Sequence, residues 1–306
     1  MKKDLISILD IDKDDYSSLI KTALTIKKDI RKYYDVLHGR NFVLIFDKPS
    51  LRTRVTFEVA IRQLGGHSLY MRGNEISLGV RETVADAAKN LSRWVDGIIM
   101  RTFGHDVISE LAETATIPVV NALTDLEHPC QALACFQTLT EHIGDIAGKK
   151  MVFVGDGNNV AHSLMLLAPL AGMDFVLCCP EGYEPSGDIE CEAKRLASEK
   201  GTEYRIDHEP CSAVEAADVI YTDVWASMGQ EEEADKRASH FNGFQVNSSL
   251  VAAAGPHCLV THCLPAHRGE EITSDVLDSD RSIAFDEAEN RLHIQKAVLY
   301  TLAGGN

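Results

Sequence analysis

A run of hydroxyl and guanidinium side chains stands out as a place where this chain could bind an anion. The run reads Ser50-Leu51-Arg52-Thr53-Arg54, and it follows soon after a short apolar segment. Ser50 suits the cap of a helix N-terminus, which presents free N–H groups and the positive end of the helix dipole. The guanidinium of Arg52 can bind two oxygens at once. The pattern is typical of a phosphate site, although a capped helix with solvated arginines would show the same spacing.

A second run, His128-Pro129-Cys130-Gln131, could supply hydrogen-bond donors at the mouth of another helix. Pro129 fits the first position of a helix and forces the residue before it into an extended conformation. His128 and Gln131 would then stand where a donor can polarise a carbonyl oxygen. A histidine that only caps the helix is the alternative.

A third run, Gly155-Asp156-Gly157-Asn158-Asn159, has the start of a dinucleotide-binding fingerprint. That fingerprint requires a third glycine where this chain has Val160. No ribose-binding carboxylate follows at the expected spacing. The sequence therefore disfavours a nucleotide site and a nicotinamide-dependent enzyme.

Two further segments carry ionisable groups after apolar runs. Asp223 could bind an ammonium group, or it could cap a helix. Cys258, His262 and Cys263 raise the possibility of zinc, but His262 and Cys263 are neighbours on one predicted strand. Successive strand residues face opposite ways, so this zinc site is disfavoured.

These segments are separated by an alternation of β-rich runs and segments with helical apolar spacing, which indicates βαβ units and parallel sheets. We expect an α/β fold with two doubly wound parallel-sheet domains. A long helix at Ala132–Ile143 separates them, and Glu287–Leu302 forms a terminal helix. The predicted domains are residues 1–143 and 144–286, and residues 287–306 return to the first domain. The predicted strands are Phe42–Phe46, His67–Met71, Gly97–Arg101, Ile117–Asn121, Lys150–Gly155, Asp174–Cys179, Asp218–Thr222, Cys258–His262 and Ser282–Asp286.

Length and composition limit the class of protein. The chain has 306 residues and a formal charge of −16, which suits neither nucleic acid nor an anionic membrane as a partner. No apolar run approaches the ~20 residues of a membrane span, and the N-terminal residues lack the apolar core of a signal peptide. The eight cysteines form no Cys-x-x-Cys pair. Reduced thiols in a cytoplasmic protein are the expected arrangement.

Four motifs together resemble the aspartate/ornithine carbamoyltransferase family. They are Ser-x-Arg-Thr-Arg, His-Pro-Cys-Gln, the Asp-x-x-x-Ser-Met-Gly stretch at residues 223–229, and His-Cys-Leu-Pro at residues 262–265. The last three resemble the ornithine branch. Leu51 stands where the family usually has Thr. The resemblance extends from about residue 42 to 300.

The resemblance implies transfer of a carbamoyl group from carbamoyl phosphate to the δ-amine of L-ornithine, without a metal or an organic cofactor. The implied catalytic residues are Arg52, Arg101, His128, Cys263 and Arg291. Carbamoyl phosphate would contact Ser50, Leu51, Arg52, Thr53, Arg101, His128, Gln131, Cys263, Leu264 and Arg291. Ornithine would contact Asn159, Asp223, Ser227 and Met228.

The resemblance also implies a homotrimer or a multiple of trimers. Residues Ile76–Thr83, with Ser77 and Arg81, correspond to a family loop that reaches a neighbouring subunit's site. Two alternatives stay open. One is a relative that acts on putrescine or an N-acylated ornithine, and the other is a non-catalytic anion-binding relative.

Overall fold

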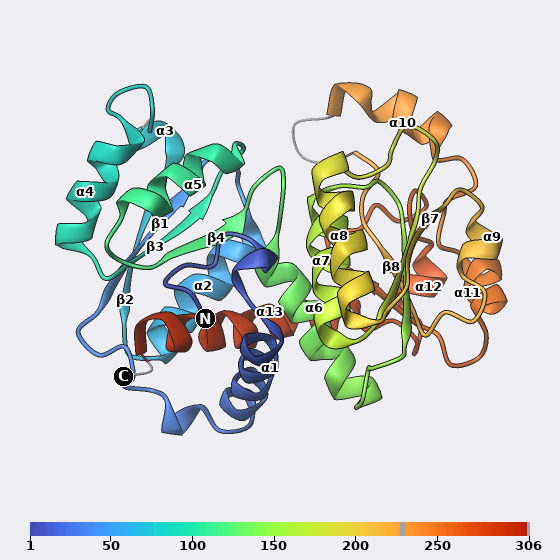
Figure 1. Ribbon diagram of the computed structural model, residues 1–306, viewed down its shortest axis with the longest axis horizontal. Helices are drawn as coiled ribbons and strands as arrows, with labels where there is room; N and C mark the ends of the chain where they lie inside the picture. Colours follow the sequence, from blue (N-terminus) through green and yellow to red (C-terminus); the bar gives the residue numbers. More distant parts are fainter. Residues whose placement is uncertain (77, 227–230, 305–306) are drawn as a thin grey trace. The chain divides into compact units, whose positions relative to one another are not determined.

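The computed structural model describes residues 1–76, 78–226 and 231–304. The chain divides into two compact units (Figure 1). Unit 1 comprises Met1–Gln137 and Glu289–Asn306, and unit 2 comprises Thr138–Ala288. Among the helices of the described ranges, none is long and apolar enough to cross a membrane.

Unit 1 is built, over its described residues, on a four-stranded parallel sheet in the order β2-β1-β3-β4. Its buried centre is made of aliphatic side chains from the strands and the helices that cover them, among them Val43, Ile98 and Leu111. The elements are η1 (Ile8–Asp10), α1 (Lys13–Lys28), η2 (Ile30–Lys32), β1 (Asn41–Phe46), α2 (Leu51–Gln63), β2 (His67–Arg72), α3 (Gly73–Ile76), α4 (Val84–Trp94), β3 (Gly97–Arg101), α5 (His105–Thr114), β4 (Val119–Leu123) and α6 (Pro129–Ile143), which continues into unit 2.

The ends of α2 follow the chemistry of its sequence. The hydroxyl oxygen of Ser50 accepts the Thr53 backbone N–H at 3.2 Å, which confirms the predicted N-cap. The chain leaves the helix through Gly65, whose φ is +90°. A Cβ atom there would lie 2.5 Å from the Tyr34 carbonyl oxygen, so glycine is required both by conformation and by space.

Unit 2 has, within its described residues, a five-stranded parallel sheet in the order β7-β6-β5-β8-β9. Its core combines strand residues such as Val152 and Ile220 with the aromatic rings of Trp225 and Phe241, which stack at 5.6 Å between centroids. The elements are β5 (Lys150–Val154), α7 (Asn159–Ala171), β6 (Asp174–Cys178), α8 (Gly187–Lys200), β7 (Tyr204–Asp207), α9 (Pro210–Ala213), β8 (Val219–Thr222), η3 (Glu231–Glu233), α10 (Ala234–His240), α11 (Ser248–Ala254), β9 (Leu259–His262) and α12 (Ser274–Leu277).

Both sheets are wound in two directions from an inner strand, as the sequence predicted. In unit 1 the chain passes from β1 outward to β2 and then to β3 and β4 on the other side. In unit 2 it passes from β5 outward to β6 and β7, and then to β8 and β9. The winding direction reverses between β1 and β3 and between β5 and β8. Ligands of open α/β sheets bind outside the carboxyl ends of the strands at such reversals.

The last predicted strand, Ser282–Asp286, is wrong. Only Ser282 forms an isolated bridge, to Val260 of β9, and helix α13 (Ala284–Leu299) begins two residues later. A short apolar run does not distinguish a strand from a helix start, and the predicted terminal helix therefore began too late. Strand β7 is absent from the predicted strands, because Tyr204–Asp207 mixes charged and apolar residues at the edge of the sheet.

The C-terminal helix returns to the first unit, as predicted. From Glu289 onward, α13 and the π-helix η4 (Tyr300–Gly304) belong to unit 1. The amide of Asn290 anchors this return, since its oxygen accepts hydrogen bonds from Gln137 Nε2 at 3.0 Å and from Lys27 Nζ at 2.9 Å.

Candidate active site

Buried polar side chains from α2, α6 and α13 meet in unit 1. Thr53 and Arg291 are almost fully buried, and an Nη2–H of Arg291 donates a hydrogen bond to Thr53 Oγ1. His128 Nε2 lies 3.5 Å from Arg291 Nη2. Three residues that are 75 or more positions apart in sequence therefore converge.

Arg101 places a second guanidinium in this group. It is the last residue of β3, and only 7% of its surface is exposed. Burial lowers the pKa of His128 well below its ordinary value, and the charges of Arg291 and Arg101 lower it further. His128 is therefore a neutral imidazole, which donates a single hydrogen bond and adds no positive charge of its own.

The remaining predicted residues of unit 1 lie at two helix N-termini. Gln131 is buried in the first turn of α6. Leu51 opens α2, and 74% of its surface is exposed. The Leu51 side chain thus points to solvent, and its backbone N–H is the group that the helix terminus offers to an anion. Arg52 follows it with a half-buried side chain.

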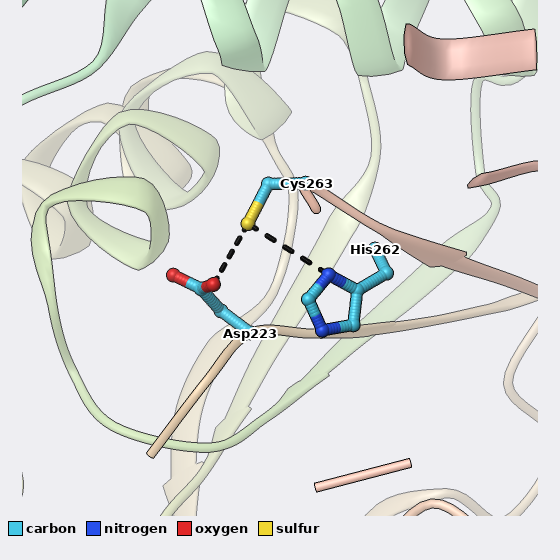
Figure 2. Close-up of side chains that lie close together, drawn as sticks. All are labelled: Asp223, His262 and Cys263. Atoms are coloured by element: carbon cyan, nitrogen blue, oxygen red, sulfur yellow. Dashed lines mark hydrogen bonds between the residues drawn. The ribbon is translucent and has the colours of Figure 1, made fainter. Parts of the chain in front are cut away.

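In unit 2 a buried carboxylate stands at the carboxyl end of β8. Asp223 is 6% exposed. Its Oδ1 accepts a hydrogen bond from the Cys263 thiol at 2.8 Å (Figure 2). The same oxygen accepts the Val224 backbone N–H at 2.8 Å. Cys263 follows β9, the neighbouring strand, so the parallel sheet brings together two residues 40 positions apart.

The His262 side chain binds its surroundings and does not activate the Cys263 thiol. Its Nδ1 accepts the Leu264 backbone N–H at 2.8 Å, so the ring proton is on Nε2, which donates to Glu271 Oε1 at 3.0 Å. Cys263 Sγ lies 4.0 Å from the same Nδ1, whose lone pair is already engaged (Figure 2). The thiol proton goes to Asp223 instead, and this arrangement lacks the Cys–His pair of a thiolate nucleophile.

The possibility of a metal was raised for Cys258, His262 and Cys263. The structure instead brings Asp223, His262 and Cys263 together, with one ligand atom of each within 4.8 Å of the others. Those atoms already bond to one another or to the Leu264 N–H. The Cys258 thiol contacts the Leu259 carbonyl at 3.4 Å.

Comparison with known proteins assigns both units. The family model "Aspartate/ornithine carbamoyltransferase, carbamoyl-P binding domain" matches residues 3–141, and the model of the same family's Asp/Orn binding domain matches residues 147–302. The chain belongs to the aspartate/ornithine carbamoyltransferase family. The family resemblance predicted from the motifs is thereby confirmed.

Individual family members are similar over almost the whole chain. An ornithine carbamoyltransferase of Thermococcus kodakarensis is 50% identical over 99% of this chain and 97% of its own length. An anabolic ornithine carbamoyltransferase of Pyrococcus furiosus gives the same identity and coverage. The solved structure of an ornithine carbamoyltransferase from Pyrococcus furiosus superposes with a TM-score of 0.96, at 50% identity, over 99% of this chain and 97% of that one.

Two residues of unit 2 to which no motif assigned a role contact the predicted site segments. Asn158, next to the predicted Asn159, donates from Nδ2 to Asp223 Oδ2 at 2.8 Å. Arg237 of α10 donates to Asp156 at 2.7 Å and to the Trp225 carbonyl at 2.9 Å. No motif reveals these links, although an Asn directly before a helix is a recognisable cap signal.

Three predicted residues lie outside the described part of the chain. They are Ser227 and Met228 of the ornithine motif and Ser77 of the subunit loop.

Proposed function

We propose that this chain transfers the carbamoyl group of carbamoyl phosphate to the δ-amine of L-ornithine, which yields L-citrulline and phosphate. The observation that carries the proposal is the 50% identity to ornithine carbamoyltransferases over both domains. The geometry agrees with it, because unit 1 buries a group of cations suited to an acyl phosphate and unit 2 buries a carboxylate suited to the ammonium of an amino acid.

Carbamoyl phosphate binds to unit 1 in this proposal. The α2 N-terminus contributes the hydroxyls of Ser50 and Thr53, the Leu51 N–H and the Arg52 fork, and Arg101 completes the phosphate contacts. His128, Gln131 and Arg291 hold the carbamoyl end. The neutral imidazole and the Arg291 guanidinium donate to the carbonyl oxygen and stabilise the oxyanion that forms during attack.

Ornithine binds to unit 2 in this proposal. Asp223 holds the α-ammonium, with Asn159, Ser227 and Met228 as further contacts. The δ-nitrogen must arrive as a free amine, since an ammonium has no lone pair. The backbone carbonyls of Cys263 and Leu264 accept hydrogen bonds from its N–H groups, and the Leu264 N–H bond to His262 fixes this turn, where φ of Leu264 is +57°. The amine attacks the carbamoyl carbon directly, the C–O bond to phosphate breaks, and phosphate leaves with the bridging oxygen. The proton that the attacking nitrogen loses goes to the departing phosphate.

A turnover assay tests the substrate. Citrulline formation is measured with ornithine, and product formation is measured in parallel with putrescine, N-acetylornithine and aspartate. Ornithine is expected to give the highest kcat/KM. A preference for putrescine or N-acetylornithine would replace the proposal with the same reaction on another amine. Binding of carbamoyl phosphate without turnover of any amine would indicate a non-catalytic relative.

The phosphate assignment is tested with Arg52→Ala. A loss of citrulline formation and of carbamoyl phosphate binding is expected, because the bidentate guanidinium contact is removed. Near wild-type activity would contradict the assignment.

We also propose a homotrimer in the cytoplasm, acting in arginine synthesis, the direction named for the Pyrococcus furiosus relative. Exposed apolar side chains support association, since Leu51 and Val55 of α2 and Leu69 of the edge strand β2 leave apolar surface uncovered. All eight cysteines are free thiols, as a reducing compartment requires. Light scattering of Leu69→Glu is expected to give a smaller mass than the wild-type chain, and an unchanged trimer would exclude this surface.

A further inference from the structure

We propose that Asn158 is a positioning residue that orients Asp223 toward the α-ammonium of ornithine. This inference rests on the proposed function. It assigns to Asn158 a role separate from that of its neighbour Asn159, which is expected to contact the substrate itself.

Both the oxygen and the nitrogen of the Asn158 side-chain amide form hydrogen bonds. Its Oδ1 accepts the Val160 and Ala161 backbone N–H groups, at 2.9 and 3.1 Å, and so caps α7. Its Nδ2 donates to Asp223 Oδ2 at 2.8 Å. Because the two helix N–H groups fix which end of the amide is the oxygen, the amide must present its NH₂ group to the carboxylate.

The carboxylate of Asp223 is thereby held from two sides. Oδ1 accepts two hydrogen bonds, from the Cys263 thiol and from Val224 N–H, which is the capacity of its lone pairs. Oδ2 accepts one from Asn158 and keeps a second acceptor position. A substrate ammonium is therefore directed to Oδ2, and the angle at which it binds depends on where Asn158 holds this oxygen.

The switch point of the sheet explains why Asn158 can do this. Asn158 follows β5 and Asp223 follows β8, and these strands pair directly, with Val154 opposite Thr222. The last paired residues thus set the two loops side by side. The length of an Asn side chain spans the gap, whereas Ser would cap the helix equally well but would not reach the carboxylate.

The test separates the two roles of Asn158, which are to cap α7 and to donate a hydrogen bond to Asp223. Asn158→Ser keeps a hydroxyl oxygen for the helix N–H groups but is too short to donate to Asp223, and it adds no charge. We expect KM for ornithine to rise about tenfold or more, the loss of a hydrogen bond to a charged group, while Kd for carbamoyl phosphate and the melting temperature stay near wild type. Asn158→Thr should behave in the same way and serves if the Ser variant does not fold.

A matched control is available in the same unit. Asn247 caps α11 through its Oδ1, which accepts Leu250 N–H at 3.1 Å. Asn247→Ser makes the same chemical change at a helix cap and should leave KM for ornithine unchanged. If the Asn158 and Asn247 variants raise KM equally, the effect is a general one of altering a helix cap and the proposal fails.

A substrate analogue supplies a readout that a purely structural role would not change. 5-Aminopentanoate has the reacting amine and the carboxylate of ornithine but lacks the α-ammonium. The ratio of kcat/KM for ornithine to that for 5-aminopentanoate should fall about tenfold in Asn158→Ser, because only ornithine uses Asp223. An unchanged ratio overturns the proposal. Absence of wild-type turnover of ornithine would instead contradict the proposed function.

Discussion

The two units offer buried groups of opposite charge and hold these groups in different ways. Unit 1 gathers positive charge from distant parts of the chain, with Arg101 at the end of a strand and Arg291 on the returning helix. In unit 2 the oxygens of the buried carboxylate Asp223 are oriented by Cys263, Val224 and Asn158. In the proposed function, unit 1 therefore holds an anion with several cations, whereas unit 2 holds an ammonium with one carboxylate whose direction is fixed by hydrogen bonds.

The largest effect should come from a cation of unit 1. Arg101→Gln removes a buried guanidinium from the anion site, and we expect kcat/KM for carbamoyl phosphate to fall by about 10²- to 10³-fold. Citrulline assays measure the change in kcat/KM, and titration calorimetry measures the binding of carbamoyl phosphate. Arg62→Gln, an exposed arginine in the last turn of α2, is the control and should retain activity. A fall of less than threefold in kcat/KM for Arg101→Gln would contradict the assignment of Arg101 to the site.

Unit 2 should respond through the other substrate. Asp223→Asn keeps the size of the side chain but removes its charge, and KM for ornithine should rise by about 10²-fold because the α-ammonium loses its partner. Binding of carbamoyl phosphate should not change, which isothermal titration can show. The exposed Asp278, changed to Asn, is a control of the same chemistry. Equal losses for both substrates would contradict the division of labour between the units.

The thiol of Cys263 should matter less than either charge. In Cys263→Ser the hydroxyl can still donate to Asp223 Oδ1, so we expect kcat to stay within about tenfold of wild type. An enzyme that used a thiolate nucleophile would lose nearly all activity. Steady-state kinetics with saturating substrates distinguishes the two outcomes.

The smallest effect is a pH dependence of stability that belongs to unit 1. The pKa of His128 is lower in the folded protein than in the unfolded chain, so the unfolded chain binds more protons between these two values. Stability is therefore lost as pH falls below about 6.5, by up to roughly 1.4 kcal/mol for each pH unit. Urea unfolding between pH 5 and 8 should show a shallower pH slope in His128→Gln than in the wild type. Identical slopes would mean that His128 is not buried as a neutral group.

The periodicity of the sequence was informative about the elements and less so about their limits. Alternating apolar runs predicted both parallel sheets, because strands buried on both faces read as short apolar segments. The apolar pattern predicted neither the edge strand β7 nor the start of α13. Tyr204–Asp207 is polar because one edge of it meets solvent, and the run Ser282–Asp286 is too short to show a helical period.

The chemistry at each strand end was also readable, since local rules governed it. Ser50 as a cap, Pro129 at the first helical position and the family motifs depend on residues within a few positions of one another. The sequence by itself thus determined the kinds of groups that this protein offers to its ligands.

Tertiary structure alone decided which of these groups meet. The approach of Arg291 to Thr53 requires the last helix to return to unit 1, and the contact of Cys263 with Asp223 requires β8 and β9 to be neighbours. The choice of Asn158 over Asn159 as the partner of Asp223 depends on where α7 begins relative to β8. Hydrogen bonds act over about 3 Å, and no local pattern specifies distances between strands that the chain joins through long crossovers.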